Sequence, residues 1–418
     1  MKGICAHPFC CAGESCCVTI CCPCKSLGAQ RKSFSKIGYV FFSLFWVLVT
    51  FILLYTAEDV FEWAHDDINC SKWNTACFGA SAAVRMSFVL MLFHILVFGI
   101  VLPKQNCSAY FHDGCWLTKF FIVLLAFIIC FWMPNDFFKG YAYFSLVVSF
   151  FFLLFQGIVI LGACYVFNDT MRARATKENN YEAVLIMFAI MLTLISVIFI
   201  ILCFVWFHDC FANNLLILIP VIFAVICVFL VILKTRESAS FFIASVMLMY
   251  LVYLTWTALA SRPTWKCNRF YGRNHGTVFQ ILVGLAFTIS TLMILAFSKR
   301  EGGEQKEHVE NKIKNMVAEE KYRDEEMDRT KRGGEVERAN VFPVSHSTIV
   351  FQVFMIFASI YYAMLLTNWG RPTIEHTHYG YFLDEWAGFW AKIVCQWVMA
   401  IIFLLSFIAP KIFKDGKW

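Results

Sequence analysis

The sequence predicts an all-α membrane protein that crosses the bilayer about ten times. Three observations lead to this fold class. Of the 418 residues, 60% are hydrophobic and only 15% are charged, whereas a soluble domain is nearer to about half apolar and a quarter charged. The mean hydropathy is +0.66. The apolar residues are also gathered into long runs, each near the length of roughly twenty residues that a helix needs to cross a bilayer.

Each of these runs has the length and composition of a transmembrane helix. Their approximate ranges are 38–56, 80–102, 117–134, 140–167, 182–207, 213–233, 239–260, 276–298, 347–367 and 388–410. Residues 1–24 are polar and rich in cysteine and contain no apolar core, so we predict no cleavable signal peptide. We expect the first run to act as the insertion signal as well.

The fourth run, 140–167, contains no charged residue and no proline. A helix of this length extends about 40 Å, beyond a hydrocarbon core of roughly 30 Å, so it must tilt, protrude or thicken the bilayer. Ser145, Ser149 and Gln156 are spaced by four and seven residues, which places them on one face. We predict an oblique helix that braces the others through one polar face. An ordinary lipid-packed helix is the alternative.

The positions of lysine and arginine predict that both termini lie in the cytosol. Basic residues before the first run, after the tenth, and in the loops after the fourth, sixth and eighth runs then all fall on the cytosolic side. One loop departs from this distribution of basic residues. It lies between the seventh and eighth runs, on the predicted outer side, and contains Arg262, Lys266, Arg269 and Arg273. We expect that loop to contact an anionic group such as lipid headgroups.

The runs divide the chain into five segments. Residues 1–37 form a cysteine-rich cytosolic segment, 38–298 contain the first eight helices, 346–410 contain the last two, and 411–418 form a cytosolic tail. The remaining segment, 299–345, is rich in Glu, Lys and Arg and has too few apolar residues for a core. A solvated cytosolic loop is the favoured interpretation, and a docking site for trafficking or regulatory proteins is the alternative.

Eight of the nineteen cysteines lie in the first 24 residues. The cytosol disfavours disulfides, and thiols just before a membrane span are candidates for S-acylation. The acylation candidates are Cys10, Cys11, Cys16, Cys17, Cys21 and Cys22. A zinc site is the weaker alternative, because the usual paired C-x2-C spacing is missing.

Four further cysteines lie on the predicted outer side, where the compartment is oxidising. We favour the pairs Cys70–Cys77 and Cys210–Cys267, although sequence alone leaves the connectivity open. Asn69 begins the N-x-S/T sequon on that side and is the glycosylation candidate.

Polar residues inside the apolar runs are the candidates for a lipid pathway, because a headgroup that crosses hydrocarbon needs partners for its charge. The lipid-binding candidates are Arg85, Gln156, Gln280, Gln352, Lys392 and Gln396. We predict that Arg85 and Lys392 hold lipid phosphates and that the glutamines line the route. Helix packing through interhelical hydrogen bonds is the alternative for each polar stripe.

Two lysines near helix ends receive different predictions. Lys392 and Gln396 lie one helical turn apart on one face, so Lys392 is predicted to face protein or a headgroup and not bare lipid. Lys119, at the start of the third run, is expected to extend to the membrane surface.

The sequence shows no pattern typical of catalysis or of ATP-driven transport. It has no carboxylate cluster with metal spacing, no Ser-His-Asp order that places these residues together, and no glycine-rich phosphate loop near a helix start. We therefore predict a protein that is not an enzyme and that needs no cofactor and no nucleic acid.

Several sequence blocks resemble the serine incorporator (Serinc) family, in that family's order and over nearly the whole chain. Besides the cysteine-rich N-terminus, they are AAVRMSFVLMLFHIL at 82–96, CWLTKFFIVLLAFIICFWMP at 115–134, FQGIVILGACYVFND at 155–169, YLVYLTWTALASRPTWKCN at 250–268, ASIYYAMLLTNW at 358–369, and FWAKIVCQW with the closing IAP within 389–410. The resemblance implies ten helices with cytosolic termini, in two bundles that a long oblique fourth helix crosses, with lipid-lined clefts. Gln352 is a departure, since we expect the family to carry a histidine there.

The resemblance also implies a function in lipid biology. The family name implies delivery of serine for phosphatidylserine and sphingolipid synthesis, and the family is associated with ATP-independent phospholipid scrambling. We predict that the protein moves phospholipids between leaflets without ATP. The alternatives are a scaffold that supplies serine to lipid-synthesis enzymes and a structural protein that orders lipids. The expected partners are membrane phospholipids, with sterols, sphingolipids, lipid-synthesis enzymes and further copies of the chain as candidates, in the plasma membrane or an endomembrane.

Overall fold

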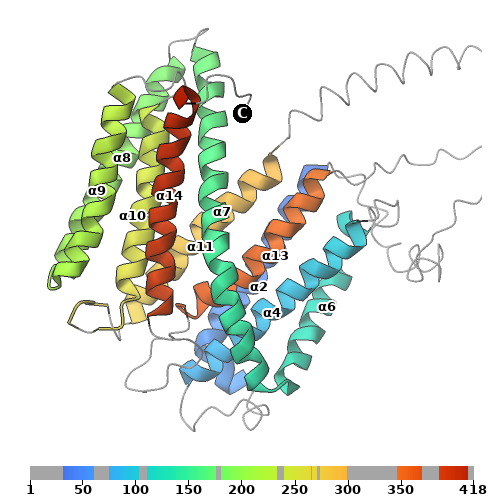
Figure 1. The fold of residues 1–418 in the computed structure, drawn as a ribbon. Coiled ribbons are helices and arrows are strands. Elements are labelled where there is room, and N and C mark those ends of the chain that lie inside the picture. Colours follow the sequence, from blue (N-terminus) through green and yellow to red (C-terminus); the bar gives the residue numbers. More distant parts are fainter. Residues whose placement is uncertain are drawn as a thin grey trace, which may run out of the picture.

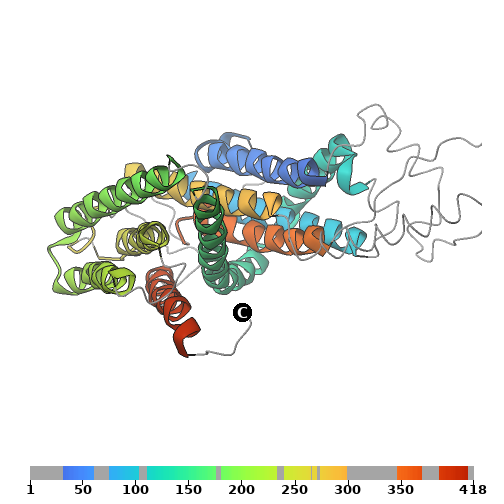
Figure 2. The same cartoon turned by 90° about the horizontal axis from the view of Figure 1, so that it is seen from above.

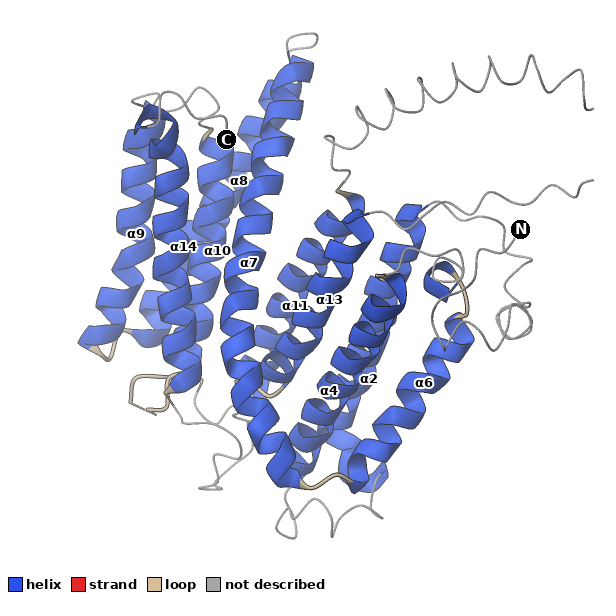
Figure 3. Cartoon of the chain, turned by 45° about the vertical axis from the view of Figure 1, so that its right-hand side comes forward, coloured by secondary structure: helices blue, strands red, loops and turns tan. Residues whose placement is uncertain are grey.

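The computed structural model describes residues 32–60, 75–102, 111–175, 180–232, 240–264, 266–270, 274–298, 346–369 and 386–412. These residues form helices and connecting turns, and no strand occurs among them (Figure 3). The ten α-helices in these ranges are α2 (Lys32–Val60), α4 (Thr75–Val101), α6 (Trp116–Ile129), α7 (Asn135–Ala175), α8 (Asn180–Phe207), α9 (Phe211–Ile232), α10 (Phe241–Ala260), α11 (Asn274–Phe297), α13 (His346–Leu366) and α14 (Ala387–Ile412). Each coincides with one predicted run, so the all-α fold class is confirmed.

Nine of the described helices are long and apolar enough to cross a membrane. The exception is α6, which has 14 residues and continues into the short 3-10 helix η3 (Cys130–Trp132). The chain leaves the helix at Met133, whose backbone is extended. The following residue is Pro134, and a proline disfavours the helical conformation in the residue before it. The third run therefore ends earlier than the sequence predicts.

Helix α7 is the longest element, with 41 residues, and extends about 60 Å at 1.5 Å per residue. It begins with Asp136 in its first turn and has Arg172 and Arg174 in its last turn. These charges complement the helix dipole at each end. The predicted polar face is confirmed as a buried face, because Ser145, Ser149 and Gln156 are all fully buried.

The other helices form two bundles on either side of α7 (Figure 1). The first bundle contains α2, α4, α6, α11 and α13, and the second contains α8, α9, α10 and α14. Helix α7 contacts α4, α11 and α13 on one side and α8, α10 and α14 on the other. In the view from above it stands between the two groups (Figure 2). The arrangement of two bundles crossed by a long fourth helix is thus confirmed.

Helix α10 lies at the centre of the second bundle. In its apolar stretch, 83% of the residues are buried inside the protein, against 17% for α8 and 22% for α9. The outer faces of α8 and α9 are covered with exposed leucine, isoleucine, valine and phenylalanine. Exposed apolar surface on this scale suits a lipid environment and would be unfavourable in water.

A disulfide joins Cys210 and Cys267, with their Cα atoms 5.3 Å apart. This predicted pairing is confirmed. Asn213 supports the same junction, because its Nδ2 donates to the carbonyl oxygen of Cys267 at 2.8 Å. Cys115 is disulfide-bonded as well, a bond that was not predicted from the sequence.

Several predictions concern residues outside the described part of the structure. These are the acylation candidates Cys10, Cys11, Cys16, Cys17, Cys21 and Cys22, the sequon at Asn69, the side chains of Cys70 and Cys77, and the loop 299–345.

Candidate functional site

Lys392 lies in the first turns of α14 and is almost completely buried, with 3% of its surface exposed. Its Nζ donates to the carbonyl oxygen of Thr257 at 3.1 Å and to Oγ of Ser261 at 2.6 Å, both at the end of α10. The ammonium group also lies 4.9 Å from the centre of the Trp369 ring. The prediction that Lys392 faces protein and not bare lipid is therefore confirmed.

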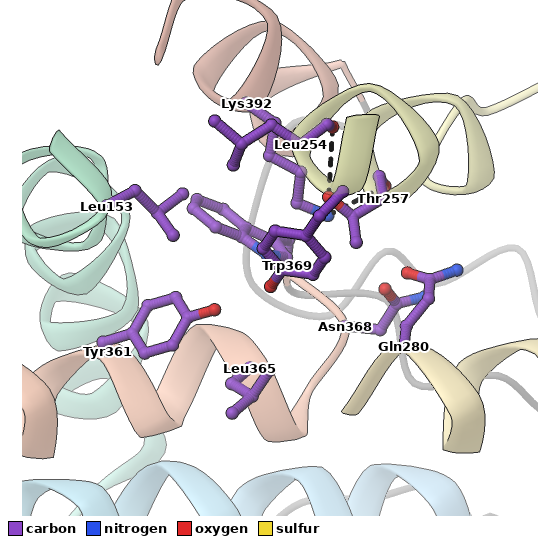
Figure 4. Close-up of a pocket in the computed structure, with 10 residues that line it drawn as sticks. Leu153, Leu254, Thr257, Gln280, Tyr361, Leu365, Asn368, Trp369 and Lys392 are labelled. Atoms are coloured by element: carbon purple, nitrogen blue, oxygen red, sulfur yellow. Dashed lines mark hydrogen bonds between the residues drawn. The ribbon is translucent and has the colours of Figure 1, made fainter. Parts of the chain in front are cut away.

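A small pocket lies beside Lys392, where the two bundles meet α7 (Figure 4). It has space for about one water molecule. Its lining comes from α7, α10, α11, α13, the turn after α13, and α14, and consists of Leu153, Tyr253, Leu254, Thr257, Gln280, Tyr361, Leu365, Asn368, Trp369 and Lys392. The structure thus places the predicted residues Gln280 and Lys392 at one site.

The turn that closes this pocket has an uncommon backbone. Asn368 and Trp369 both have positive φ angles, 48° and 61°. The amide of Trp369 donates to the carbonyl oxygen of Met364 at 2.7 Å, which ends α13 with left-handed residues where glycine is usual. Trp369 lies so close to Gly388 of α14 that a Cβ atom added there would be 2.6 Å from Trp369 Cβ. The turn therefore holds the indole ring over the Lys392 ammonium.

Further buried polar side chains lie on α7 and α14, and those of Gln156 and Gln396 contact α10. We call Ser149, Gln156 and Gln396 the seam residues; all three are fully buried. Gln396 Nε2 donates to Thr255 Oγ1 at 2.6 Å, and Tyr250 donates to Gln156 Oε1 at 3.4 Å. Each seam residue also keeps an atom with no hydrogen-bond partner among the described residues, namely Ser149 Oγ, Gln156 Nε2 and Gln396 Oε1.

Arg85 of α4 is also fully buried, but it has a structural role. Its Nε donates to the carbonyl oxygen of Cys130 at 3.0 Å, and its Nη2 donates to that of Met133 at 3.2 Å and to Asn135 Oδ1 at 2.9 Å. Carbonyl groups at a helix end lack partners within the helix, and Arg85 satisfies those where η3 ends. Because protein atoms occupy these donors, the prediction that Arg85 holds a lipid phosphate is wrong for this structure.

Lys119 and Gln352 both lie inside the first bundle. Lys119 is fully buried, donates to the carbonyl oxygen of His112 at 2.9 Å, and lies 4.2 Å from the Trp116 ring. The expectation that it extends to the membrane surface is therefore wrong. Gln352 of α13 contacts His94 and His112 and does not line the Lys392 pocket.

The chemistry available at the Lys392 pocket is that of anion binding. Lys392 has an amino group that can carry a positive charge, and no carboxylate of the described residues forms an ion pair with it. Its ammonium group has three donors, of which the two protein contacts above use two. The remaining donor can bind one oxygen atom, which in the pocket as it stands is that of a single water molecule.

The comparison with known proteins agrees with the sequence blocks and with the fold. The family model described as "Serine incorporator (Serinc)" matches residues 9–416. The chain belongs to the serine incorporator family. It is accordingly a multi-pass membrane protein.

Relatives of this serine incorporator occur in distant organisms. A protein named "Probable serine incorporator" from Nematostella vectensis is 25% identical over 99% of this chain and 98% of its own length. "Serine incorporator 2" from Homo sapiens is 22% identical over 97% of this chain and 95% of its own length. A "Probable serine incorporator" from Dictyostelium discoideum is 25% identical over 66% and 69%, respectively.

Several residues of the Lys392 pocket could not be identified from the sequence. Tyr253, Tyr361 and Trp369 lie within the blocks that resemble the family, but aromatic residues in an apolar run give no sign of which neighbour they contact. The end of the ASIYYAMLLTNW block does carry a signal. Asparagine tolerates the left-handed conformation better than most residues, so Asn368 after an apolar run indicates a helix end.

Proposed function

We propose that this serine incorporator moves phospholipids between leaflets without ATP and without catalysis, along the contact between α7, α10 and α14. In this proposal Lys392 binds the anionic oxygen atoms of the headgroup, and the seam residues give it further hydrogen bonds. Gln280 contributes at the pocket end of the route.

The observation that carries the proposal is the unmet hydrogen-bonding capacity of the seam residues. Buried polar atoms in proteins nearly always have partners, and each exception calls for an explanation. Here two such atoms, Gln156 Nε2 and Gln396 Oε1, belong to side chains that contact α10 from α7 and α14, and Lys392 is buried at the junction of the two bundles. A polar lipid headgroup, or water that accompanies it, supplies the acceptors and donors that these atoms lack.

The contact between α7 and the second bundle is closed in this structure. The seam residues are fully buried, and Gly157 of α7 lies against Met399 and Tyr250. A headgroup can pass only if this contact opens, so lipid movement requires the two bundles to separate along α7.

The test is reconstitution of the purified protein into liposomes with a fluorescent phospholipid in one leaflet and no nucleotide. We expect the protein to equilibrate the reporter and Lys392→Met to slow this exchange about 10- to 100-fold, because a hydrogen bond to a charged group contributes about 1.5–3 kcal/mol. The matched control is Lys139→Met. Lys139 is exposed and pairs with Asp136 at the surface, so this variant should exchange lipid at the original rate.

The names of the relatives support a second candidate, a scaffold that supplies serine to lipid-synthesis enzymes. Purified protein that leaves the reporter in its original leaflet would favour that scaffold, or a protein that orders lipids without moving them. If the wild-type protein moves lipid and Lys392→Met moves it at the same rate, the proposed role of Lys392 is wrong, but the proposed lipid movement is not contradicted.

A further inference from the structure

A chain of hydrogen-bonded side chains runs through the first bundle, well away from the Lys392 pocket. Ser43 Oγ lies 3.0 Å from His94 Nε2, and His94 Nδ1 lies 3.2 Å from Gln352 Oε1. Gln352 Nε2 lies 3.4 Å from His112 Nε2, and His112 Nδ1 lies 2.7 Å from Asp113 Oδ1. These residues come from α2, α4, α13 and the segment before α6, so four separate parts of the chain meet here.

The two ends of this chain differ in their access to solvent. The side chain of Asp113 is 44% exposed, whereas Ser43, His94 and Gln352 are fully buried. Ser43 lies eight residues beyond Ser35, where the apolar stretch of α2 begins, which corresponds to roughly 12 Å of helix. The chain therefore links a solvent-accessible carboxylate to a hydroxyl group deep in the bundle.

The direction of every hydrogen bond follows from the exposed end. An ionised carboxylate only accepts, so His112 must donate to Asp113 through Nδ1–H. Neutral His112 then accepts at Nε2 from the Gln352 amide nitrogen. Gln352 Oε1 accepts from His94 Nδ1–H, and Ser43 donates its hydroxyl hydrogen to His94 Nε2. All donors point towards Asp113, and none of these polar atoms is left without a partner.

We propose that His112 and Asp113 form a proton-binding site and that Gln352 transmits its occupancy to His94 and Ser43. A proton bound at His112 Nε2 turns that atom into a donor, which opposes the donating amide of Gln352. The conflict disappears when the amide rotates, so that Gln352 Oε1 accepts from His112 and its nitrogen donates to His94 Nδ1. His94 then carries its hydrogen on Nε2 and donates to Ser43.

The proton balance of this change is simple. One proton is taken up in all, and it forms the Nε2–H bond of His112. At His94 one proton leaves Nδ1 and one binds Nε2, so the ring stays neutral; because His94 is fully buried, these two transfers take place with water that enters during transient openings of the bundle. The links His112–Gln352, Gln352–His94 and His94–Ser43 thus have two states of opposite direction, which one proton interconverts, while His112 donates to Asp113 in both.

The charges around His112 decide the pH at which it takes up the proton. Burial lowers the pKa of His112, the hydrogen bond and charge of Asp113 raise it, and the charges of Lys119 and Lys36 lower it, with a net result below its ordinary value. Burial raises the pKa of the Asp113 carboxyl, but its hydrogen bond with His112 and the nearby Lys119 bring it below its ordinary value.

The other titratable groups that face His112 are Tyr39 of α2 and, through Gln352, His94 of α4. The site is therefore empty at neutral pH, and His112 takes up its proton at a lower pH than an ordinary histidine does.

This inference goes beyond the proposed function and does not depend on it. The test is nuclear magnetic resonance of the full-length protein, labelled with ¹⁵N-histidine in lipid nanodiscs and titrated with acid. Signals are assigned with His94→Gln and His112→Gln. We expect His94 to move its hydrogen from Nδ1 to Nε2 at the same midpoint at which His112 becomes doubly protonated, and to remain neutral.

Variants at Gln352 test whether the change at His94 depends on the Gln352 amide or only on the nearby charge of protonated His112. In Gln352→Met, His112 should still take up a proton, but the change at His94 should be lost. In Gln352→Glu, the added carboxylate should shift the His112 midpoint to higher pH. The exposed pair His208–Asp209 provides an internal reference without a relay. The proposal is overturned if His94 keeps its hydrogen on Nδ1 throughout, if it becomes a cation, if it changes equally in Gln352→Met, or if His112 takes up no proton before the protein unfolds.

Discussion

The two buried polar clusters differ in how completely the protein satisfies them. In the first bundle, every ring nitrogen and amide atom of His94, Gln352 and His112 has a protein partner. Along α7, the seam residues keep atoms without a partner among the described residues. Both clusters lie among membrane-spanning helices and both are shielded from lipid, so burial alone does not distinguish them.

The difference indicates what each cluster can do. A complete network holds its helices in one arrangement, because breaking any link leaves a costly buried group. In an incomplete network some buried polar atoms lack hydrogen bonds, which lowers the stability of the folded protein. A ligand that supplies these hydrogen bonds binds with the corresponding gain in free energy. Proton binding inside a complete network and ligand binding along an incomplete one are the corresponding expectations.

The largest expected effect is a difference in stability between substitutions of two buried basic side chains, Arg85 and Lys392. Arg85→Met should lower the free energy of unfolding by about 3 kcal/mol, because it leaves several buried acceptors at the end of η3 without a donor. Lys392→Met should change it by less than about 1 kcal/mol, because replacing a buried charge by an apolar side chain is often neutral. Ser261 Oγ also donates to the Thr257 carbonyl oxygen without Lys392. Denaturant unfolding in detergent measures both.

Arg174→Met is the control for this pair, since Arg174 is exposed in the last turn of α7. A large loss of stability in Lys392→Met, equal to that in Arg85→Met, would give the two cations the same structural role and remove the contrast between them.

The second expected effect concerns the close contact between α7 and the second bundle. A Cβ atom on Gly157 would lie 2.5 Å from Met399 Cε and 2.9 Å from Tyr250. Gly157→Leu should therefore cost about 2 kcal/mol of unfolding free energy through overpacking, as measured by thermal unfolding. Gly162→Leu, on the same helix where nothing lies within 4 Å, should cost nothing. Equal stability of the two variants would show that the contact opens easily.

The smallest expected effect compares the glutamines directly. Gln352→Leu should lower the free energy of unfolding by about 1.5 kcal/mol, since His94 and His112 each lose a partner. Gln156→Leu removes an amide whose Nε2 has no partner, so stability should stay the same or rise slightly, while lipid exchange slows. Denaturant unfolding and lipid exchange in liposomes are measured for both variants. A greater loss of stability in Gln156→Leu than in Gln352→Leu would contradict the proposed difference between the two clusters.

The helices and the polar face of α7 were predictable because they depend on local composition and spacing. The orientation of Lys392 was also predictable, from Gln396 one turn away. The partners of Arg85 were not, because they are backbone carbonyl groups, which carry no sequence signal. Lys119 was mispredicted for a related reason: its burial depends on aromatic residues brought together by tertiary contacts, with Tyr39 in a separate helix. His94 and Gln352 are 258 residues apart, beyond any periodicity.

Helix α13 contributes Gln352 to the hydrogen-bonded chain of the first bundle and leads at its other end to the Lys392 pocket. Gln352 lies in its second turn, and Trp369 lies directly after its end, about 25 Å away along the helix axis. A helix of this length moves largely as a rigid body, so a displacement of α13 at Gln352 also displaces the indole ring above Lys392. The changes in unfolding free energy caused by substitutions at Gln352 and Trp369 should consequently be non-additive, although the two side chains do not touch. Helix α13 would then couple the two ends of the molecule energetically.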